Sequence, residues 1–468
     1  MFKTKTRGRR VFSYRQQKRR RFSLFSAIAS LALFLLILEL LTRIFVDLSG
    51  NRDKFAQGKT GSEIIQAYQL KFVPNESQID RTKDQQALFA KPALSVGYQL
   101  LSNQESQFWQ INPQGFRDRD PVPLVKPKDE IRIFILGNST AFGYGSRENG
   151  ATISEQLEQR LEERLQQQKT SPQLYKSGLL SGDQAEKPKS PAKPAKIKPG
   201  NYRVINAAVP GYVSGNELAQ LALQILKYKP DLIIVMDGYE DFMLPSNEDA
   251  TQVPQLKNYL EDRQTGFKGY INQLIEPIKN KSYLVKIAQE RWLNSKQADE
   301  KTDFILDEQS SKLVQYLPQN QKELQARIDR YVEHQKQMLS LSTASLVPLI
   351  VAIQPEITGR NPAQLTDTEG TITTELGRTY IERMRNEYPA LIEATQQLAE
   401  AFPQNLKAVD LYKLSDQYPS PSFIDPINLN EAANQKVAEQ LYYAIASFSK
   451  MQVTSKQAPT PKPVDQNR

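Results

Sequence analysis

Five short apolar runs, separated by longer polar stretches with helical periodicity, constrain the fold of this chain more than any other feature. The segments between the runs, such as ISEQLEQRLEERL (153–165), repeat apolar residues at spacings of three and four, which is typical of an amphipathic helix. Continuous apolar strands with helical connections predict a parallel sheet covered on both faces, in a three-layer α/β/α domain. The runs are IRIFILG (131–137), YRVINAAV (202–209), PDLIIVMDG (230–238), LVPLIVAIQP (346–355) and NLKAVDLY (405–412).

The centres of these runs supply the side chains expected in the buried sheet. Helices must cover both faces of a parallel sheet, so each of these side chains needs an apolar neighbour. A charge placed among them is left without a partner in an apolar environment. The expected core residues are Ile133, Ile135, Ile205, Ile233, Val235, Leu349, Val351 and Val409.

An apolar segment near the N-terminus predicts a membrane anchor. Residues 22–41, FSLFSAIASLALFLLILELL, contain one charged residue, Glu39. About twenty apolar residues in a helix span the ~30 Å hydrocarbon core of a bilayer. The alternative is a cleaved signal peptide, but TRIFVDLSGNRD (42–53) offers no small-residue cleavage site. We therefore expect an uncleaved transmembrane signal anchor over residues 22–44.

Positive charge is concentrated before this segment. The formal net charge is +9, and residues 1–21 alone hold ten Lys and Arg and no acid. The rest of the chain is close to neutral, which argues against a basic face for nucleic acid. By the positive-inside rule, residues 1–21 form a basic cytoplasmic tail, and residues from about 48 onward lie outside the cytoplasm. We expect a single-pass membrane protein with its main domain in the periplasm or another extracytoplasmic space.

The composition of residues 45–468 indicates one folded domain with additional segments before, within and after it. The chain has no cysteine and one histidine, which excludes disulfides, thiolate zinc sites and histidine-rich metal sites, and we expect no cofactor. His334 is expected as an exposed or partly packed helical residue. The expected segments are a membrane-proximal extension (45–125), the α/β domain (126–450) with a disordered insertion rich in Lys, Pro and Ser (169–200) and a helical insertion (243–340), and a disordered tail (451–468).

Polar segments follow the apolar runs at the places where a parallel sheet carries its site. In open α/β sheets, ligands bind beyond the carboxyl ends of the strands. Gly137 allows a tight strand-to-helix turn that presents Ser139 at the start of the next helix, where N–H groups stabilise an anion. A serine at this place is also a common helix cap, so both roles stay open. The segments are GNS (137–139), NAAVPG (206–211), DGYED (237–241) and DPINLNEAANQ (425–435).

These four segments, in this order and strand context, resemble the sequence blocks of the SGNH/GDSL esterase superfamily. The resemblance covers about residues 111–446, and INPQGFRD (111–118) resembles the lead-in of membrane-anchored members. It implies a flavodoxin-like α/β/α fold and chemistry on ester bonds. It also implies that Ser139 stands at the position of the nucleophile, with Asn138 replacing the aspartate of the G-D-S signature.

Other blocks depart from the family pattern. The resemblance puts Ala208 where the family has an oxyanion-hole glycine, and Glu240 where it has an asparagine that donates to the oxyanion. The last block normally reads D-x-x-H, and here Asp425 is followed by Asn428 in the histidine position. These residues form the expected substrate and catalytic site, without a metal.

The departures weaken catalysis for physical reasons. Asn428 has no basic lone pair near neutral pH, so it cannot take a proton from Ser139 as imidazole does. A carboxylate at Glu240, about 4 Å from an oxyanion at an effective dielectric near 20, costs on the order of 4 kcal/mol, roughly a thousandfold in rate.

We therefore expect a catalytically degenerate member that binds or scaffolds in envelope or exopolysaccharide processing. Its expected partners are the membrane and either an acylated polysaccharide or another envelope protein, with no nucleic acid. The alternative is an active esterase or O-acyltransferase on acylated glycans, with Ser139 as nucleophile and an atypical base such as a desolvated Glu240.

Overall fold

The computed structural model describes residues 64, 67–73, 87–176, 193–247 and 313–453. The expected membrane anchor lies outside these residues. Among the residues described, no helix is both long and apolar enough to cross a membrane. The chain divides into two compact units, Met1–Glu63 and Ile64–Arg468, and all of the described residues belong to the second.

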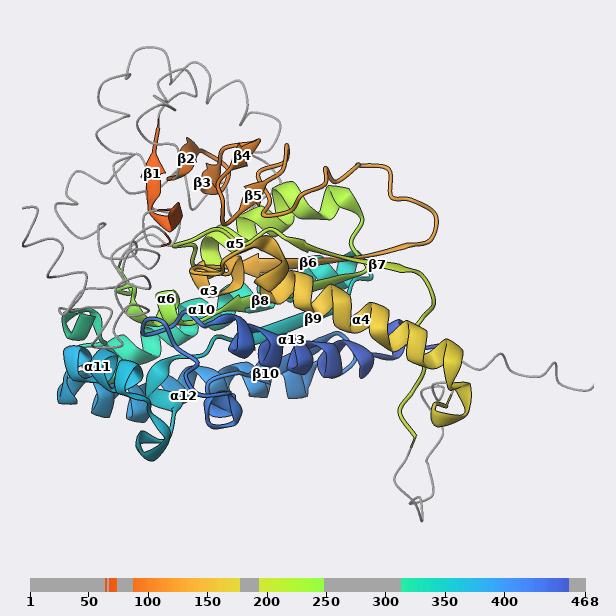
Figure 1. Cartoon of the computed structure of the whole chain (residues 1–468). Helices are drawn as coiled ribbons and strands as arrows, with labels where there is room; N and C mark the ends of the chain where they lie inside the picture. Colours follow the sequence, from red (N-terminus) through yellow and green to blue (C-terminus); the bar gives the residue numbers. More distant parts are fainter. Residues whose placement is uncertain (1–63, 65–66, 74–86, 177–192, 248–312, 454–468) are drawn as a thin grey trace, which may run out of the picture. The chain divides into compact units, whose positions relative to one another are not determined.

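A five-stranded parallel sheet forms the centre of the domain, in the order β10-β9-β8-β6-β7 (Figure 1). This arrangement confirms the α/β fold predicted from the apolar runs. The first connection leads from β6 to β7, and the following connections lead in the opposite direction across the sheet. The topological switch point, where α/β sheets bind ligands, therefore lies between β6 and β8. The strands are β6 (Glu130–Gly137), β7 (Asn201–Asn206), β8 (Leu232–Asp237), β9 (Leu349–Ile353) and β10 (Leu406–Asp410).

Helices cover both faces of the sheet, as buried parallel strands require. Helices α4 and α13 pack side by side on one face, whereas α10 packs between α5 and α12 on the other (Figure 1). Right-handed crossovers place α4 opposite α5, because the chain leaves β6 and β7 in opposite directions. The α-helices are α3 (Ser139–Phe142), α4 (Ile153–Thr170), α5 (Ser214–Gln220), α6 (Tyr239–Met243), α10 (Gln321–Ala344), α11 (Asp367–Leu376), α12 (Arg378–Ala401) and α13 (Glu431–Ala446).

The buried sheet agrees with the expected core at all positions except one. Of the eight expected residues, all are buried apart from Val409, which is half-buried. Val409 lies on β10, which is the edge strand and pairs only with β9. An edge strand has a neighbour on one side only, so its side chains are covered less completely.

Residues 87–125, which the sequence assigns to an extension, contribute side chains to the same hydrophobic core as the sheet. Trp109 is 2% exposed, and its Nε1 donates to the carbonyl of Ala67 at 2.9 Å. Tyr98 donates to the carbonyl of Pro210, in the loop after β7, at 2.7 Å. These residues therefore pack at the carboxyl end of the sheet. The short strands here are β1 (Leu70–Phe72), β2 (Leu88–Ala93), β3 (Gly97–Leu100), β4 (Gln104–Glu105) and β5 (Gln110–Ile111).

The described ends of the two expected insertions are also part of the domain. Helix α4 continues to Thr170, and Lys176 forms a β-bridge with Ala195. Helix α10 lies largely within the expected second insertion, and it packs against β9 of the central sheet. Arg327 of α10 donates to the carbonyl of Phe242 at 2.6 Å. The central parts, 177–192 and 248–312, lie outside the described residues, as do residues 454–468 of the expected tail.

Candidate functional site

The turn from β6 into α3 can be made only with glycine at position 137. Gly137 has φ +148°, and a Cβ there would lie 2.2 Å from the carbonyl oxygen of Met236 on β8. Asn138 then caps α3, because its Oδ1 accepts from the N–H of Thr140 at 3.1 Å. Ser139 is the first residue of α3 and is 1% exposed. The helix cap is therefore Asn138, and the serine is the next residue.

A polar cluster surrounds the side chain of Asn138. Its Nδ2 donates to the carboxylate of Glu240, on α6, and to Oε1 of Gln354, directly after β9. All three side chains are buried. The family resemblance places a carboxylate at position 138 and an amide at position 240, and this chain has the two groups exchanged. The exchange retains an amide–carboxylate contact, but Glu240 now supplies an acceptor where an oxyanion needs a donor.

Asp425 and Asn428 form a buried turn before α13. Oδ1 of Asp425 accepts from the main-chain N–H of Ile427 at 3.0 Å and of Asn428 at 2.7 Å, and its Oδ2 accepts from Nδ2 of Asn428 at 2.8 Å. Burial raises the pKa of Asp425 above its usual value, and these three hydrogen bonds offset only part of that rise. Thr140 of α3 donates to the carbonyl of Ile427 at 3.2 Å, so this turn lies against the helix that begins with Ser139.

The second block is held by Asn206, the last residue of β7. The N–H of Ala208 donates to Oδ1 of Asn206 at 3.2 Å, and Nδ2 of Asn206 donates to the carbonyl of Ala141 at 3.1 Å. The N–H of Val209 donates to the carbonyl of Gly137 at 2.9 Å. The amide that the family pattern assigns to the oxyanion hole is therefore engaged within its own turn.

The predicted site residues thus gather at the carboxyl edge of the sheet, around the switch point between β6 and β8. The single histidine of the chain, His334, does not lie at the position of Asn428. His334 lies on α10, where its Nδ1 is 2.7 Å from Oγ of Ser214. It is half-buried, in agreement with the partly packed residue expected from the sequence. In the part of the chain that the structure describes, no group of three His, Asp or Glu side chains has the arrangement of a metal site.

Sequence reasoning missed two residues that position this site. Gln354 follows an apolar run directly, so its place at a strand end was a usable signal. Arg117, in the lead-in block, is fully buried and donates to the carbonyls of Phe142 and Gly143 at 3.0 and 2.8 Å. It also donates to the hydroxyl of Tyr68 at 2.7 Å. Burial lowers the pKa of Arg117. The guanidinium closes the C-terminal end of α3, where carbonyl groups lack partners within the helix.

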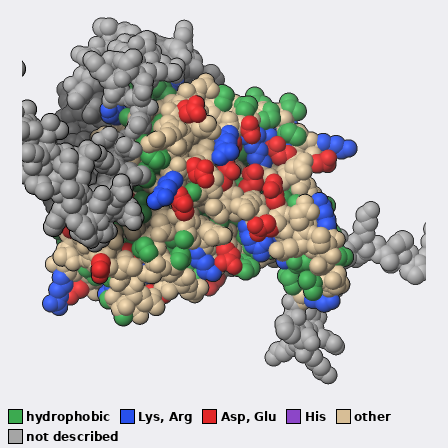
Figure 2. All heavy atoms as spheres, in the orientation of Figure 1, with side chains coloured by type: hydrophobic (Ala, Val, Ile, Leu, Met, Phe, Trp, Pro, Cys, Tyr) green, Lys and Arg blue, Asp and Glu red, His purple; other side chains and the backbone are tan. Residues whose placement is uncertain are grey.

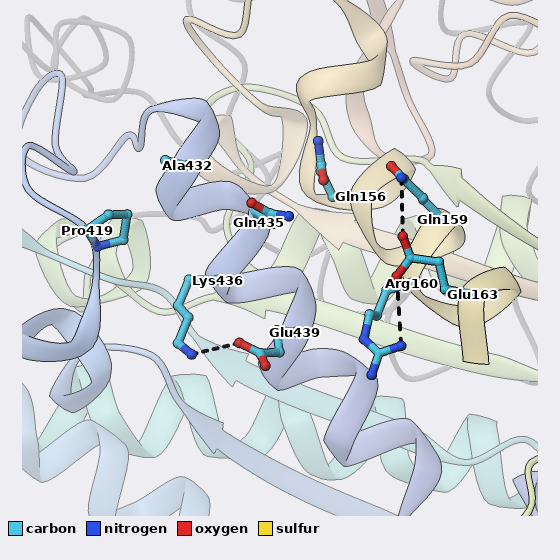
Figure 3. A pocket seen from close by; sticks show the side chains of 9 residues that line it. All are labelled: Gln156, Gln159, Arg160, Glu163, Pro419, Ala432, Gln435, Lys436 and Glu439. Atoms are coloured by element: carbon cyan, nitrogen blue, oxygen red, sulfur yellow. Dashed lines mark hydrogen bonds and ion pairs between the residues drawn. The ribbon is translucent and has the colours of Figure 1, made fainter. Parts of the chain in front are cut away.

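A surface groove of about 510 Å³ lies between α4 and α13, and neither Ser139, Glu240 nor the Asp425–Asn428 turn lines it (Figure 3). Its charged side chains pair with each other: Lys436 with Glu439 at 2.6 Å, and Arg160 with Glu163 at 3.9 Å. Acidic and basic side chains are mixed across this face of the domain (Figure 2). The lining residues are Gln156, Gln159, Arg160, Glu163, Pro419, Ala432, Gln435, Lys436 and Glu439.

Comparisons with known proteins found similar solved structures and one matching family model. An acetylxylan esterase from Geobacillus stearothermophilus, in a catalytic variant, has 12% identity and a TM-score of 0.33, over 71% of this chain and 100% of that protein. A lipase/acylhydrolase from Enterococcus faecalis has 13% identity and a TM-score of 0.32, over 69% of this chain and 100% of that protein. No curated protein matches the chain. The family model GDSL-like Lipase/Acylhydrolase matches residues 133–441, well over half of the sequence, from β6 of the central sheet into α13. The chain therefore belongs to the GDSL-like lipase/acylhydrolase family.

Proposed function

We propose that this protein is a catalytically degenerate family member that binds acylated polysaccharide in the cell envelope, or scaffolds an envelope protein that processes it. The observation that carries the proposal is the Asp425–Asn428 turn. Asn428 contacts Asp425 through its main-chain N–H and its side-chain amide N–H. An amide nitrogen does not accept a proton near neutral pH, so Asn428 cannot serve as a general base. The residue in the family's histidine position therefore does not activate the serine as a general base.

The position of Glu240 supports the same conclusion. Its carboxylate accepts a hydrogen bond from Asn138, the residue directly before Ser139. Negative charge there opposes the oxyanion that forms when a serine attacks an ester. Removal of one oxyanion donor typically costs about 3 kcal/mol, before any repulsion is counted. The substrate class rests on the resemblance to membrane-anchored members, which often act on acyl groups of cell-surface glycans.

We further propose that residues 22–44 anchor the protein in a membrane as a single span, with the domain outside the cytoplasm. The support is the length of the apolar segment and the ten cationic residues before it. Such an anchor would hold the domain close to the surface at which envelope polymers are made and modified.

The experiment is a comparison of ester hydrolysis by the full-length protein and by its Ser139→Ala variant, with p-nitrophenyl acetate and with an acetylated oligosaccharide. The exposed Ser447→Ala variant is the matched control. We expect equal rates for all three proteins, together with retention of the acetylated oligosaccharide on the wild-type protein in an equilibrium binding assay. Hydrolysis that is lost in Ser139→Ala but not in Ser447→Ala would establish an active enzyme and overturn the proposal.

A further inference from the structure

A second group of buried polar side chains lies where α5, β8 and α10 meet, next to the candidate site. Asp237 is the last residue of β8 and is fully buried. One of its carboxyl oxygens accepts from the hydroxyl of Tyr331 at 2.7 Å, and the other accepts from Nε2 of Gln335 at 2.9 Å. Both donors come from α10, so this carboxyl group ties the helix to the central strand.

Glu217 of α5 approaches the same carboxyl group and is also fully buried. Its carboxyl group lies within reach of a side-chain hydrogen bond with that of Asp237. No N–H or O–H donor among the described residues reaches either oxygen of Glu217. Two ionised carboxylates have no donor to place between them and repel each other. A single proton between the two groups, donated by Glu217 and accepted by Asp237, removes this repulsion.

The surroundings favour retention of this proton. Two further carboxylates, Asp241 and Glu240, lie on α6 close to Glu217 and oppose its ionisation. Asp241 accepts from the N–H of Ser214 at 2.9 Å and also from its hydroxyl. Burial and these charges raise the pKa of Glu217 well above its usual value and that of Asp237 to about 7. The groups facing the pair are Asp241, Glu240, Tyr331, Tyr212, Tyr388, His334 (through Ser214) and Arg330, which donates to the carbonyl of Asp241.

We propose that Glu217 and Asp237 form a carboxylic acid–carboxylate pair that holds one proton in the folded protein, and that loss of this proton loosens the junction of α5, β8 and α10. Asp237 directly precedes the Gly238–Glu240 segment. A change in packing at this junction would therefore shift Glu240. The pair thus makes the position of this site residue sensitive to pH.

The sign of the pH dependence follows from linkage. Glu217 keeps its proton in the folded protein, whereas in the unfolded chain it ionises near pH 4.5. The folded state then holds more protons, so stability is full below this value and falls as pH rises through the folded pKa. Above about pH 7, where Asp237 is already ionised, the remaining proton belongs to Glu217. Over that range the folding equilibrium constant should fall by up to about tenfold for each pH unit because of this one group.

The test compares thermal unfolding of the full-length wild-type protein and its Glu217→Gln variant between pH 7 and 9. Glutamine donates an N–H to Asp237 and cannot ionise, so the variant should lose much less stability over this range. Glu356→Gln is the matched control, since Glu356 is also fully buried but has a pKa of about 7 and does not contact the pair. The control should keep the slope of the wild-type protein between pH 8 and 9. Equal slopes for wild type and Glu217→Gln would overturn the proposal.

A second measurement needs no variant. The number of protons released on unfolding at pH 8 can be obtained by calorimetry in buffers of different ionisation enthalpy. The proposal requires that the wild-type protein releases about one proton, because the unfolded chain does not retain the proton of Glu217. Asp237→Asn should reduce this release, since an amide at position 237 can donate to ionised Glu217. Absence of proton release by the wild-type protein would contradict the proposal, whether or not the variants fold.

Discussion

Asn428 is joined to Asp425 by a main-chain and a side-chain hydrogen bond, at 2.7 and 2.8 Å. An imidazole at position 428 would use one ring nitrogen for Asp425 and leave the other for a serine hydroxyl. Asparagine makes the first interaction, but its amide offers no basic nitrogen for the second. At the level of single residues, asparagine therefore retains the contact with Asp425, and under the proposed function it does not act as a base. The Glu240 carboxylate is a second obstacle to ester hydrolysis. It acts on the oxyanion and not on the proton transfer, so its effect is separate from that of Asn428.

The first prediction concerns both positions together. Asn428→His alone should give little activity, because Glu240 still repels an oxyanion. The double variant Asn428→His with Glu240→Asn supplies a base oriented by Asp425 and an amide donor. Its gain in ester hydrolysis should exceed the product of the two single gains, since the two changes act on the same transition state. The measurement is kcat/KM for p-nitrophenyl acetate in all four proteins.

The gain must depend on the serine. Ser139→Ala in the double-variant background should return the rate to that of the wild-type protein. If the unaltered protein hydrolyses the ester and Asn428→Ala abolishes the reaction, the asparagine takes part in catalysis. The hypothesis of a catalytically degenerate protein is then wrong.

At the scale of elements, the central strand β8 and the edge strand β10 differ in how completely they are covered. Val235 is fully buried between neighbouring strands β6 and β9, whereas Val409 on β10 is half-buried. The two residues have the same side chain and lie on parallel strands of one sheet. They therefore allow burial to be varied while the chemistry of the substitution stays constant.

The second prediction uses this pair. Val235→Asp should prevent folding, because the carboxylate has no partner and its burial costs more than the usual net stability of a domain, about 5–15 kcal/mol. Val409→Asp should be tolerated with a smaller loss, of about 1–3 kcal/mol, since its carboxylate can reach water. Soluble yield and urea unfolding followed by circular dichroism measure both effects. Cooperative unfolding of Val235→Asp at wild-type stability would show that this strand is assigned incorrectly.

Arg117 illustrates how an element far away in sequence supports the site. Its side chain connects the lead-in segment with the end of α3, which begins with Ser139. The guanidinium also lies 5.0 Å from the ring centroid of Phe142. A buried cation held by carbonyl groups and aromatic rings is an arrangement that the sequence pattern does not reveal.

For the whole molecule, the orientation in the membrane remains a prediction from the sequence. Residues 22–41 separate a strongly basic tail from a nearly neutral remainder. The third prediction is that a reporter active only in the cytoplasm, fused after Arg468, gives no signal, whereas one active only outside gives a strong signal. Replacement of the ten basic residues before the span by glutamine should weaken this preference. A strong cytoplasmic signal from the unaltered fusion would refute the orientation.

The fold class, the order of the strands along the chain and the segments that form the site can all be predicted from the sequence alone. These features follow from local rules: apolar runs form buried strands, glycine allows the turn at position 137, and the carboxyl ends of parallel strands share one edge. Asn138, Ser139 and Glu240 lie within three residues of the end of a strand, so these rules place all three at that edge.

The side chains that meet across the sheet cannot be predicted in the same way. The contact of Asn138 with Gln354, the use of the Ala208 amide by Asn206, and the pairing of Glu217 with Asp237 all depend on strand order and helix packing. Residues far apart in sequence come together only when loops close and apolar surfaces pack. A periodic pattern specifies which face of an element is buried, but the partner on the other side is set by the three-dimensional arrangement.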